Sequence, residues 1–526
     1  MSNARKLLSY ILRSLKSLWV KILIIFKYRT SLKYRTTRQS SDKDNTNKTS
    51  KSDYHIVRAI PETKGLPVVG TLFELMSAGG AAKLHEYIDK RHAEHGPIFR
   101  ERLGGKQDAV FVSSASLMRN VFLHEGQYPQ HPIPDAWKLY NEKYKCERGL
   151  FFMDGEEWLH NRRIMNKFLI NGNLNWMDAY IETSTEKVIN KWKKQCLALQ
   201  PESENFIKIY DLELQLYHWA VDVVCTIMFG PNYDNNDEIL TGLCDFSRVV
   251  NKIFKSSSNL MNFPPKLAKL LNLEIWTEFE EHVTDVLFRS SQIIDLFIEQ
   301  INEENEKEEV PDTAPIFFKL KSAGMSHEMI KRIFVDLVIA AGDTTAYTTE
   351  WALYLLSQNS LLQQKIYKDI QQNAAEAQLV NGLLKETLRL YPVAPFIGRY
   401  LADDATLEDY SIEKNTLVLL SLYTAGRDAK HFPQPFTVMP ERWKRNEKTG
   451  ELKNVLQAHG TLPFAIGSRS CIGRKIATNQ IKSFLTAICN NFQLKCLNEK
   501  PIERILRLVT VPNEQLRLSI KLRQAS

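Results

Sequence analysis

The stretch GSRSCIG, residues 467–473, carries one cysteine, Cys471, between two glycines. Gly467 and Gly473 allow backbone conformations that are closed to other residues, so the chain can approach a flat ligand closely. Amide groups of such a turn can point at sulfur and keep it as a thiolate, while Arg469 can meet an acidic group on the ligand. These features together predict a cysteine thiolate that binds a haem iron.

Phe464 stands seven positions before the cysteine and would keep water away from the sulfur. A lone cysteine is more often a buried free thiol, and that alternative applies to Cys471 taken by itself. With both glycines, Phe464 and Arg469 in register, the phrase resembles the haem-binding loop of the cytochrome P450 monooxygenases, a family with thiolate-ligated haem. The resemblance implies haem b as cofactor and Cys471 as the axial ligand of its iron.

The resemblance also implies the family's fold, a mainly α-helical single catalytic domain with a small β-rich lobe. A chain of 526 residues, 44% of them hydrophobic, can bury a large core, although length alone would also allow two or more domains. Helical periodicity dominates the sequence. Short β-prone stretches lie near 98–102, 109–112, 417–420 and 506–511.

The cysteines and the charge exclude several other classes of protein. Seven cysteines are scattered along the chain without close pairs, which argues against a disulfide framework or a zinc site and favours a reducing compartment. The net charge of +8 is modest for this length. Because no helix-turn-helix, zinc-finger or aromatic-basic RNA motif is present, nucleic-acid binding has little support.

The first 41 residues contain ten lysines or arginines and no acid. Their longest apolar stretch, Leu18–Phe26, is broken by Lys21 and is shorter than the roughly 20 residues of a membrane-spanning helix. We expect residues 1–41 to be a mitochondrial presequence, with a basic arm lying on a membrane as the alternative. Residues 42–59 are then a polar linker and 60–526 the haem-thiolate domain. The implied location is the matrix side of the inner mitochondrial membrane.

A long helix is predicted from Ser326 to about Ser357, and it contains AAGDTT at 340–345. Small side chains before Thr344 would let a planar ligand and dioxygen approach the helix. A hydroxyl beside a carboxylate can relay protons, so Asp343 and Thr344 are the candidate catalytic pair. The alternative is a threonine that hydrogen-bonds to its own helix carbonyl. The family's motif usually has glycine where this chain has Ala341.

A buried structural cluster is expected below the cysteine loop. Glu386 and Arg389 are three positions apart and can pair on one helix face, among leucines that indicate burial. The resemblance adds Arg442 as a third member that braces the loop. Val438 stands where the family has phenylalanine.

Four residues form the expected set that binds the haem propionates. Trp158 and Arg162 are one helical turn apart, and an indole N–H with a guanidinium suits a propionate. By resemblance this set also contains Arg399 and Arg469.

A haem thiolate favours O–O cleavage, so the resemblance implies insertion of one oxygen atom of O2 into an unactivated C–H bond. The chain has no G-x-G-x-x-G fingerprint for a flavin or nicotinamide. Electrons are therefore expected from an adrenodoxin-like ferredoxin with its NADPH-dependent reductase. Lys385, Arg474 and Lys475 match basic docking positions of the mitochondrial branch, whereas Asn381 replaces another lysine of that branch.

Residues 260–271 mix apolar and basic side chains and could touch a membrane beside the substrate entrance, which favours a lipophilic substrate. Residues 149–163 and 340–349 resemble the ecdysteroid 2-hydroxylases of insect mitochondria, which convert 2-deoxyecdysone to ecdysone. The alternatives are another steroid position, a xenobiotic-oxidising cytochrome P450, and a haem-thiolate binding or sensing protein without turnover.

Overall fold

The computed structural model describes residues 58–67, 69–103, 108–172, 174–198, 206–231, 249–250, 252–261, 263–304, 311–372, 377–446, 450–452 and 454–523. These residues belong to one compact unit, Ile56–Ser526. The expected presequence and most of the expected linker lie outside the described residues.

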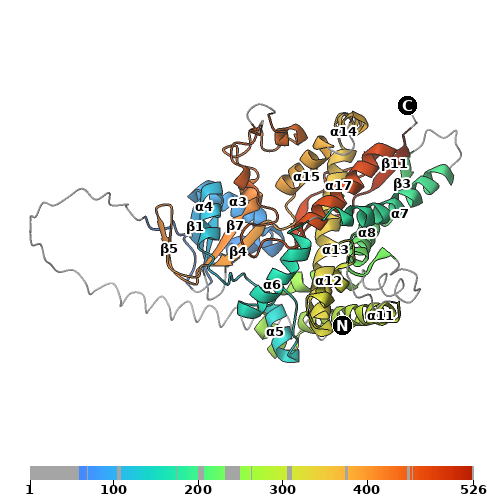
Figure 1. Cartoon of the computed structure of the whole chain (residues 1–526). Helices are drawn as coiled ribbons and strands as arrows, with labels where there is room; N and C mark the ends of the chain where they lie inside the picture. Colours follow the sequence, from blue (N-terminus) through green and yellow to red (C-terminus); the bar gives the residue numbers. More distant parts are fainter. Residues whose placement is uncertain are drawn as a thin grey trace, which may run out of the picture. The chain divides into compact units, whose positions relative to one another are not determined.

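Helices make up most of the described chain (Figure 1). The α-helices are α2 (Leu72–Ser77), α3 (Leu84–His95), α4 (Ala115–Leu123), α5 (Asp135–Tyr144), α6 (Gly155–Leu169), α7 (Trp176–Ala198), α8 (Leu212–Phe229), α10 (Pro265–Leu270), α11 (Glu274–Glu304), α12 (Ile316–Ser322), α13 (His327–Ser357), α14 (Ser360–Gln372), α15 (Gln378–Leu390), α16 (Leu422–Ala425) and α17 (Arg474–Asn491). Short 3₁₀ turns are η1 (Gly80–Lys83), η3 (Pro440–Trp443) and η4 (Ala458–Gly460).

The strands are short and form small sheets. They are β1 (Ile98–Glu101), β2 (Ala109–Val112), β3 (Ile207–Lys208), β4 (Phe396–Tyr400), β5 (Ala405–Leu407), β6 (Tyr410–Ile412), β7 (Leu417–Ser421), β8 (Phe492–Cys496), β9 (Arg504–Leu506), β10 (Thr510–Pro512) and β11 (Leu518–Leu522). The largest sheet has the order β1-β2-β7-β4, in which only the β2–β7 pair is parallel. Smaller sheets pair β3-β11-β8, β5-β6 and β9-β10.

The predicted long helix is confirmed as α13. Its N-cap is Ser326, whose side chain accepts a hydrogen bond from the Met329 N–H and so satisfies a free donor of the first turn. The helix then runs without interruption to Ser357. Burial on most of its sides explains the high apolar content that the sequence shows.

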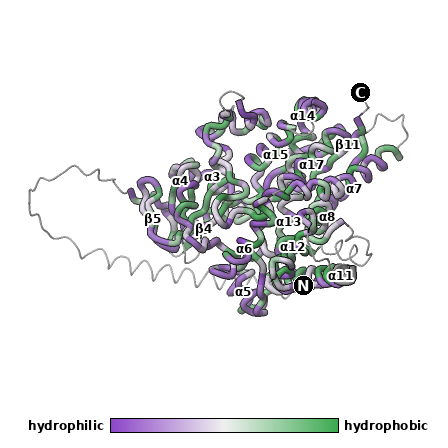
Figure 2. The backbone as a smooth tube through the Cα atoms, viewed as in Figure 1, coloured by the Kyte–Doolittle hydropathy of each residue, from purple (hydrophilic) through white to green (hydrophobic). Residues whose placement is uncertain are grey.

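Helices α8 and α13 lie side by side in the largest hydrophobic cluster, and apolar residues follow both along their length (Figure 2). Strands of the four-stranded sheet carry a second cluster on the other side of the cysteine loop, where Ala465 and Ile466 pack against it. The loop therefore lies between the helical part and the β-rich part. Among the described helices, none is long and apolar enough to cross a membrane.

The mainly helical fold with a small β-rich lobe is as predicted. The stretches 98–102, 109–112 and 417–420 became β1, β2 and β7. The β-prone stretch 506–511 contains the end of β9 and the start of β10, which pair antiparallel across a turn. Alternation of apolar residues could not distinguish one strand from such a tight hairpin.

Candidate active site

A large apolar cavity lies between α13 and the cysteine loop. It has about 1230 Å³ of empty space, part of it open to solvent. Cys471, Phe464 and Gly473 line it from the loop, and Ala340, Ala341 and Thr344 line it from α13; α6, α8 and the β9–β10 turn add apolar side chains. Most of its lining is apolar, as in other sites that bind small molecules.

The cysteine loop closes on itself before α17 begins. The Cys471 N–H donates to the Phe464 carbonyl over 2.8 Å, and the Ser470 N–H donates to the Gly467 carbonyl over 3.2 Å. Gly467 has φ of +82°, which favours glycine, as the sequence predicts. The same expectation for Gly473 is wrong, since its φ of −81° is open to any residue. A Cβ on Gly473 would meet no protein atom within 4 Å, so this glycine widens the cavity instead.

The Cys471 side chain is open to the cavity yet lies deep within the protein. Burial raises the pKa of its thiol, while a hydrogen bond from the Gly473 backbone and the charges of Arg162 and Arg474 act in the opposite direction. The Gly473 amide, Arg162 on α6 and Arg474 at the start of α17 thus favour the thiolate, against the larger effect of burial. A bound cation would complete the neutralisation of a thiolate here.

Three arginines of the expected propionate set gather around this loop. Arg162 Nη2 donates to the Ser470 carbonyl over 2.6 Å, and Arg469 Nη2 donates to the Met153 carbonyl over 2.6 Å. Arg399 Nε donates to Glu125 Oε2 over 2.8 Å. The guanidinium of Arg469 also lies 4.3 Å from the centre of the Trp158 ring. Trp158 is buried, and its expected hydrogen bond to a propionate stays a prediction.

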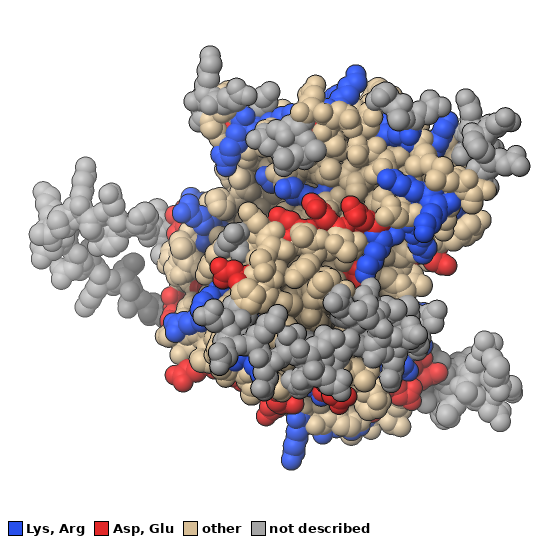
Figure 3. All heavy atoms as spheres, turned by 45° about the vertical axis from the view of Figure 1, so that its right-hand side comes forward, with Lys and Arg blue, Asp and Glu red and all other residues tan. Residues whose placement is uncertain are grey.

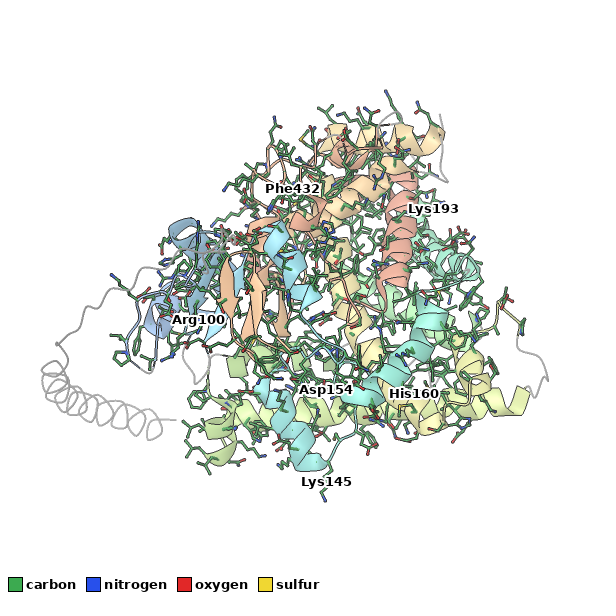
Figure 4. The ribbon with its side chains drawn as sticks, turned by 60° about the vertical axis from the view of Figure 1, so that its left-hand side comes forward. Arg100, Lys145, Asp154, His160, Lys193 and Phe432 are labelled. Carbon is green, nitrogen blue, oxygen red and sulfur yellow. The ribbon has the colours of Figure 1, made fainter. Side chains whose placement is uncertain are left out.

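Each of these arginines keeps a buried nitrogen without a hydrogen-bond partner: Nε of Arg162, Nη2 of Arg399 and Nε of Arg469. Burial and the charges of Arg399 and Arg162 lower the pKa of Arg469 to about 10, while Asp154 opposes the shift. Asp154, labelled at the start of α6 in Figure 4, is more than half exposed. Buried donors that exceed their acceptors fit an anionic group such as the haem propionates.

Thr344 and Asp343 lie on different sides of α13. Thr344 lines the cavity, and its hydroxyl donates to the Ala340 carbonyl over 2.8 Å, so the alternative of a bond to its own helix does occur. The hydroxyl oxygen keeps acceptor capacity toward the cavity. Asp343 is instead buried toward α8, where burial and then Glu213 raise the pKa of its carboxyl to about 8, opposed by Arg507.

The glycine of the α13 motif lies at position 342, one position later than in the family pattern, and the packing of α8 gives a reason for it. A Cβ on Gly342 would lie 2.4 Å from a ring carbon of Tyr217, on α8. The hydroxyl of Tyr217 is buried without a hydrogen-bond partner, and the charge of Asp343 raises its pKa further beyond the effect of burial. The missing side chain at Gly342 therefore allows α8 to place a tyrosine next to the acid.

The structure brings the expected bracing residues together. Glu386 accepts two hydrogen bonds from Arg389, over 2.8 and 2.7 Å, and lies 3.3 Å from Arg442 Nε. Trp443 Nε1 and the Met439 N–H also donate to Glu386, over 2.9 Å each. These bonds hold the segment around η3 against α15.

The expected docking residues surround a separate hollow on the side of the loop away from α13. Lys385, Arg474 and Lys475 line it together with Trp443 and Phe464. Arg474 and Lys475 are exposed, whereas Lys385 is half-buried with its ammonium 5.3 Å from the centre of the Trp443 ring. Burial lowers the pKa of Lys385, and nearby cations lower it further.

Sequence reasoning missed several residues at this site, notably Glu125, His131 and Tyr217. His131 packs against Phe151 and has a buried ring nitrogen without a partner close to the arginines. None of these three residues belongs to a motif or has a sequence spacing that would indicate a functional role. Only the contacts across the fold show that they belong to the site.

The fold, the cavity and the cysteine loop define a haem-thiolate enzyme of the helical class. The family described as cytochrome P450 matches residues 60–520, and the chain belongs to this family. It is accordingly a monooxygenase with a haem iron held by a cysteine thiolate.

Relatives that match nearly the whole chain support the same family. The chain is 54% identical over 468 residues to "Cytochrome P450 315a1, mitochondrial" of Drosophila melanogaster, with 88% of each chain covered. It is 26% identical to "Sterol 26-hydroxylase, mitochondrial" of Rattus norvegicus, covering 89% of this chain and 90% of the relative. It is also 26% identical to "Cholesterol side-chain cleavage enzyme, mitochondrial" of Oncorhynchus mykiss, covering 86% and 88%.

Proposed function

We propose that the protein is a mitochondrial steroid hydroxylase that converts 2-deoxyecdysone to ecdysone by hydroxylating carbon 2. The observation that carries the steroid class is the cavity, whose walls are apolar from α6, α8 and α13 to the β9–β10 turn. A rigid apolar substrate loses little entropy in such a site and gains from burial. The 2-hydroxylation rests on the resemblance of residues 149–163 and 340–349 to insect ecdysteroid 2-hydroxylases.

The relatives support the same class without fixing the carbon atom. Two of them are named as enzymes that act on a sterol or on cholesterol, and all three carry the word mitochondrial in their names. The reaction consumes one O2, two electrons and two protons; one oxygen atom enters the C–H bond and the other leaves as water. Bound haem would supply the oxygen activation.

The residues of this chain have the following proposed roles. Cys471 would hold the iron, and Arg162, Arg399 and Arg469 would bind the propionates with the nitrogens that have no partner. The Thr344 hydroxyl, fixed to the Ala340 carbonyl, would accept and pass on a proton at the cavity wall. Asp343 lies behind it and would hold a proton near neutral pH, because burial raises its pKa to about 8.

Electrons would come from an adrenodoxin-like ferredoxin and its NADPH-dependent reductase. The exposed Arg474 and Lys475, beside Lys385, give the loop side of the domain a basic surface near Phe464. Acidic partners are attracted to such a surface. The proposed location is the matrix side of the inner mitochondrial membrane, and Leu267, Leu270 and Leu271 are exposed where a peripheral membrane contact is expected.

The test is product identification after incubation of the purified enzyme, ferredoxin and reductase with a panel of ecdysteroid precursors. We expect one added oxygen on 2-deoxyecdysone, placed at carbon 2 by mass spectrometry and NMR. Oxidation only of other sterols would move the assignment to another hydroxylase. Complete lack of turnover with normal haem spectra would favour a binding or sensing protein.

The ligand assignment has a separate test in Cys471→Ala. This variant should lose the reduced carbon-monoxide absorption band that is typical of a thiolate haem. If the band persists, Cys471 is not the axial ligand.

A further inference from the structure

We propose that Glu125 is a positioning residue for the haem thiolate: it joins the cysteine loop to strand β4 and so holds Cys471 at the iron. The inference rests on the proposed role of Cys471 as the ligand. Glu125 stands just after α4, far from the loop in sequence. It belongs to none of the motifs that indicate the haem site.

Both oxygens of the Glu125 carboxylate are used, and each binds a different part of the site. Oε2 accepts from Arg399 Nε over 2.8 Å. Oε1 accepts from the Ser468 N–H over 3.1 Å and lies 3.4 Å from the Ser468 hydroxyl. Glu125 is 5% exposed and Arg399 4% exposed, so water does not compete for this bridge.

Gly467 shows how closely the carboxylate approaches the loop. A Cβ at Gly467 would lie 2.1 Å from Glu125 Oε1, so the carboxylate would have to leave this position. The turn therefore needs glycine for two reasons, the positive φ and the contact with Glu125. Cys471 follows three residues after the Ser468 N–H, within the turn closed by the bond from the Cys471 N–H to the Phe464 carbonyl.

The carboxylate of Glu125 also compensates part of the positive charge of the arginines that are proposed to bind the haem propionates. Arg399 donates Nε to Glu125 and Nη1 to the Gly398 carbonyl, and its Nη2 stays without a partner. Asp154 also meets an arginine of this cluster, but it binds Arg469 from a largely exposed position. Glu125 is thus the buried carboxylate that compensates the arginines on the loop side, and one residue couples propionate binding to thiolate placement.

The experiment compares Glu125→Gln with Glu101→Gln in the full-length, haem-loaded protein. Glutamine keeps the shape, but its amide cannot accept from both Arg399 and Ser468. Glu101 is a matched control: it is 1% exposed in the β-rich lobe, accepts hydrogen bonds from Thr71 and Tyr87 over 2.5 Å each, and lies 3.4 Å from Arg91. Both variants remove one buried carboxylate charge.

The readouts are the rate of haem transfer to apomyoglobin and the fraction of reduced protein with the thiolate carbon-monoxide band. We expect Glu125→Gln to lose haem about 10- to 100-fold faster than wild type and to lose part of the thiolate band. Glu101→Gln should lower thermal stability without either change. Equal haem retention and equal thiolate fractions in the two variants would overturn the proposal.

If Glu125→Gln does not accumulate, Glu125→Asp decides, because it keeps the charge but is one methylene too short to reach both partners. It should lose haem faster than Glu101→Gln, and wild-type haem retention would overturn the proposal. The outcome is distinct from failure of the ligand assignment. That failure would appear as a thiolate band in Cys471→Ala, whatever Glu125→Gln does.

Discussion

Two of the three buried carboxyl groups of α13 lie where charge is costly. Asp343 and Glu350 are each 2% exposed, and their spacing puts them on the same helix face. Burial and then Glu213 raise the pKa of each to about 8, while Arg507 opposes the shift at Asp343 and the Leu516 N–H opposes it at Glu350. Both groups therefore carry a proton in the folded protein at neutral pH.

Glu350→Gln tests this protonation through stability. The pKa of Glu350 rises from 4.5 to about 8 on folding. Between those values the folded protein binds a proton that the unfolded chain has released, so the free energy of unfolding falls as the pH rises, by up to about 1.4 kcal/mol per unit. The variant lacks the contribution of the Glu350 carboxyl to this pH dependence. We expect its stability to depend less steeply on pH in urea unfolding across that window.

The exposed Glu142 on α5 provides the control for that measurement. Glu142→Gln should follow the wild-type pH dependence, since it replaces an exposed side chain and leaves the buried carboxyl groups of α13 unchanged. Parallel curves for Glu350→Gln and wild type would contradict a protonated Glu350.

At the scale of elements, the contact between α8 and α13 depends on Gly342. Alanine is favoured over glycine inside a helix by about 1 kcal/mol. Here, however, its Cβ would lie 2.4 Å from a ring carbon of Tyr217. Overpacking of a core typically costs about 1–3 kcal/mol. We therefore expect Gly342→Ala to lower the free energy of unfolding.

Denaturant unfolding of Gly342→Ala, Tyr217→Leu and the double variant measures this contact as a double-mutant cycle. In the Tyr217→Leu background the alanine should become neutral or stabilising, because the ring that it meets is gone. A Gly342→Ala protein more stable than wild type would show that α8 yields easily and that the close contact is unimportant.

Features of the fold that depend on neighbouring residues could be predicted from the sequence. The α13 boundaries follow from a local cap and a continuous apolar pattern, and the loop around Cys471 follows from residues within one turn. Local chemistry of this kind can be read along the chain. The composition of 506–511 indicated β structure but not the turn within it, because a tight hairpin and a strand have similar composition.

The remainder of the site depends on contacts between distant segments. Glu125 meets Arg399 across 274 positions and Ser468 across 343, and neither spacing has a pattern in a single sequence. Asp343 follows the same rule: it is next to Thr344 in sequence, but packing against α8 buries its carboxyl while Thr344 lines the cavity.

For the molecule as a whole, the arrangement of charge is more informative than its sum. The net charge of +8 is modest. Among the described residues of the face in Figure 3, basic and acidic side chains are interspersed. A partner would therefore be guided by a local group of cations, and the exposed pair Arg474 and Lys475 beside the hollow is the group proposed here.

Lys475→Glu tests this docking surface without endangering the fold, because Lys475 lies in the first turn of α17, where an acid is favourable. The reversal should raise the KM for an adrenodoxin-like ferredoxin about tenfold at low salt and leave kcat nearly unchanged, since it slows encounter. The difference should shrink as salt reduces the Debye length below about 10 Å. Lys321→Glu, an exposed reversal at the end of α12, is the matched control. Equal KM values for the two variants at every salt concentration would place ferredoxin docking elsewhere on the molecule.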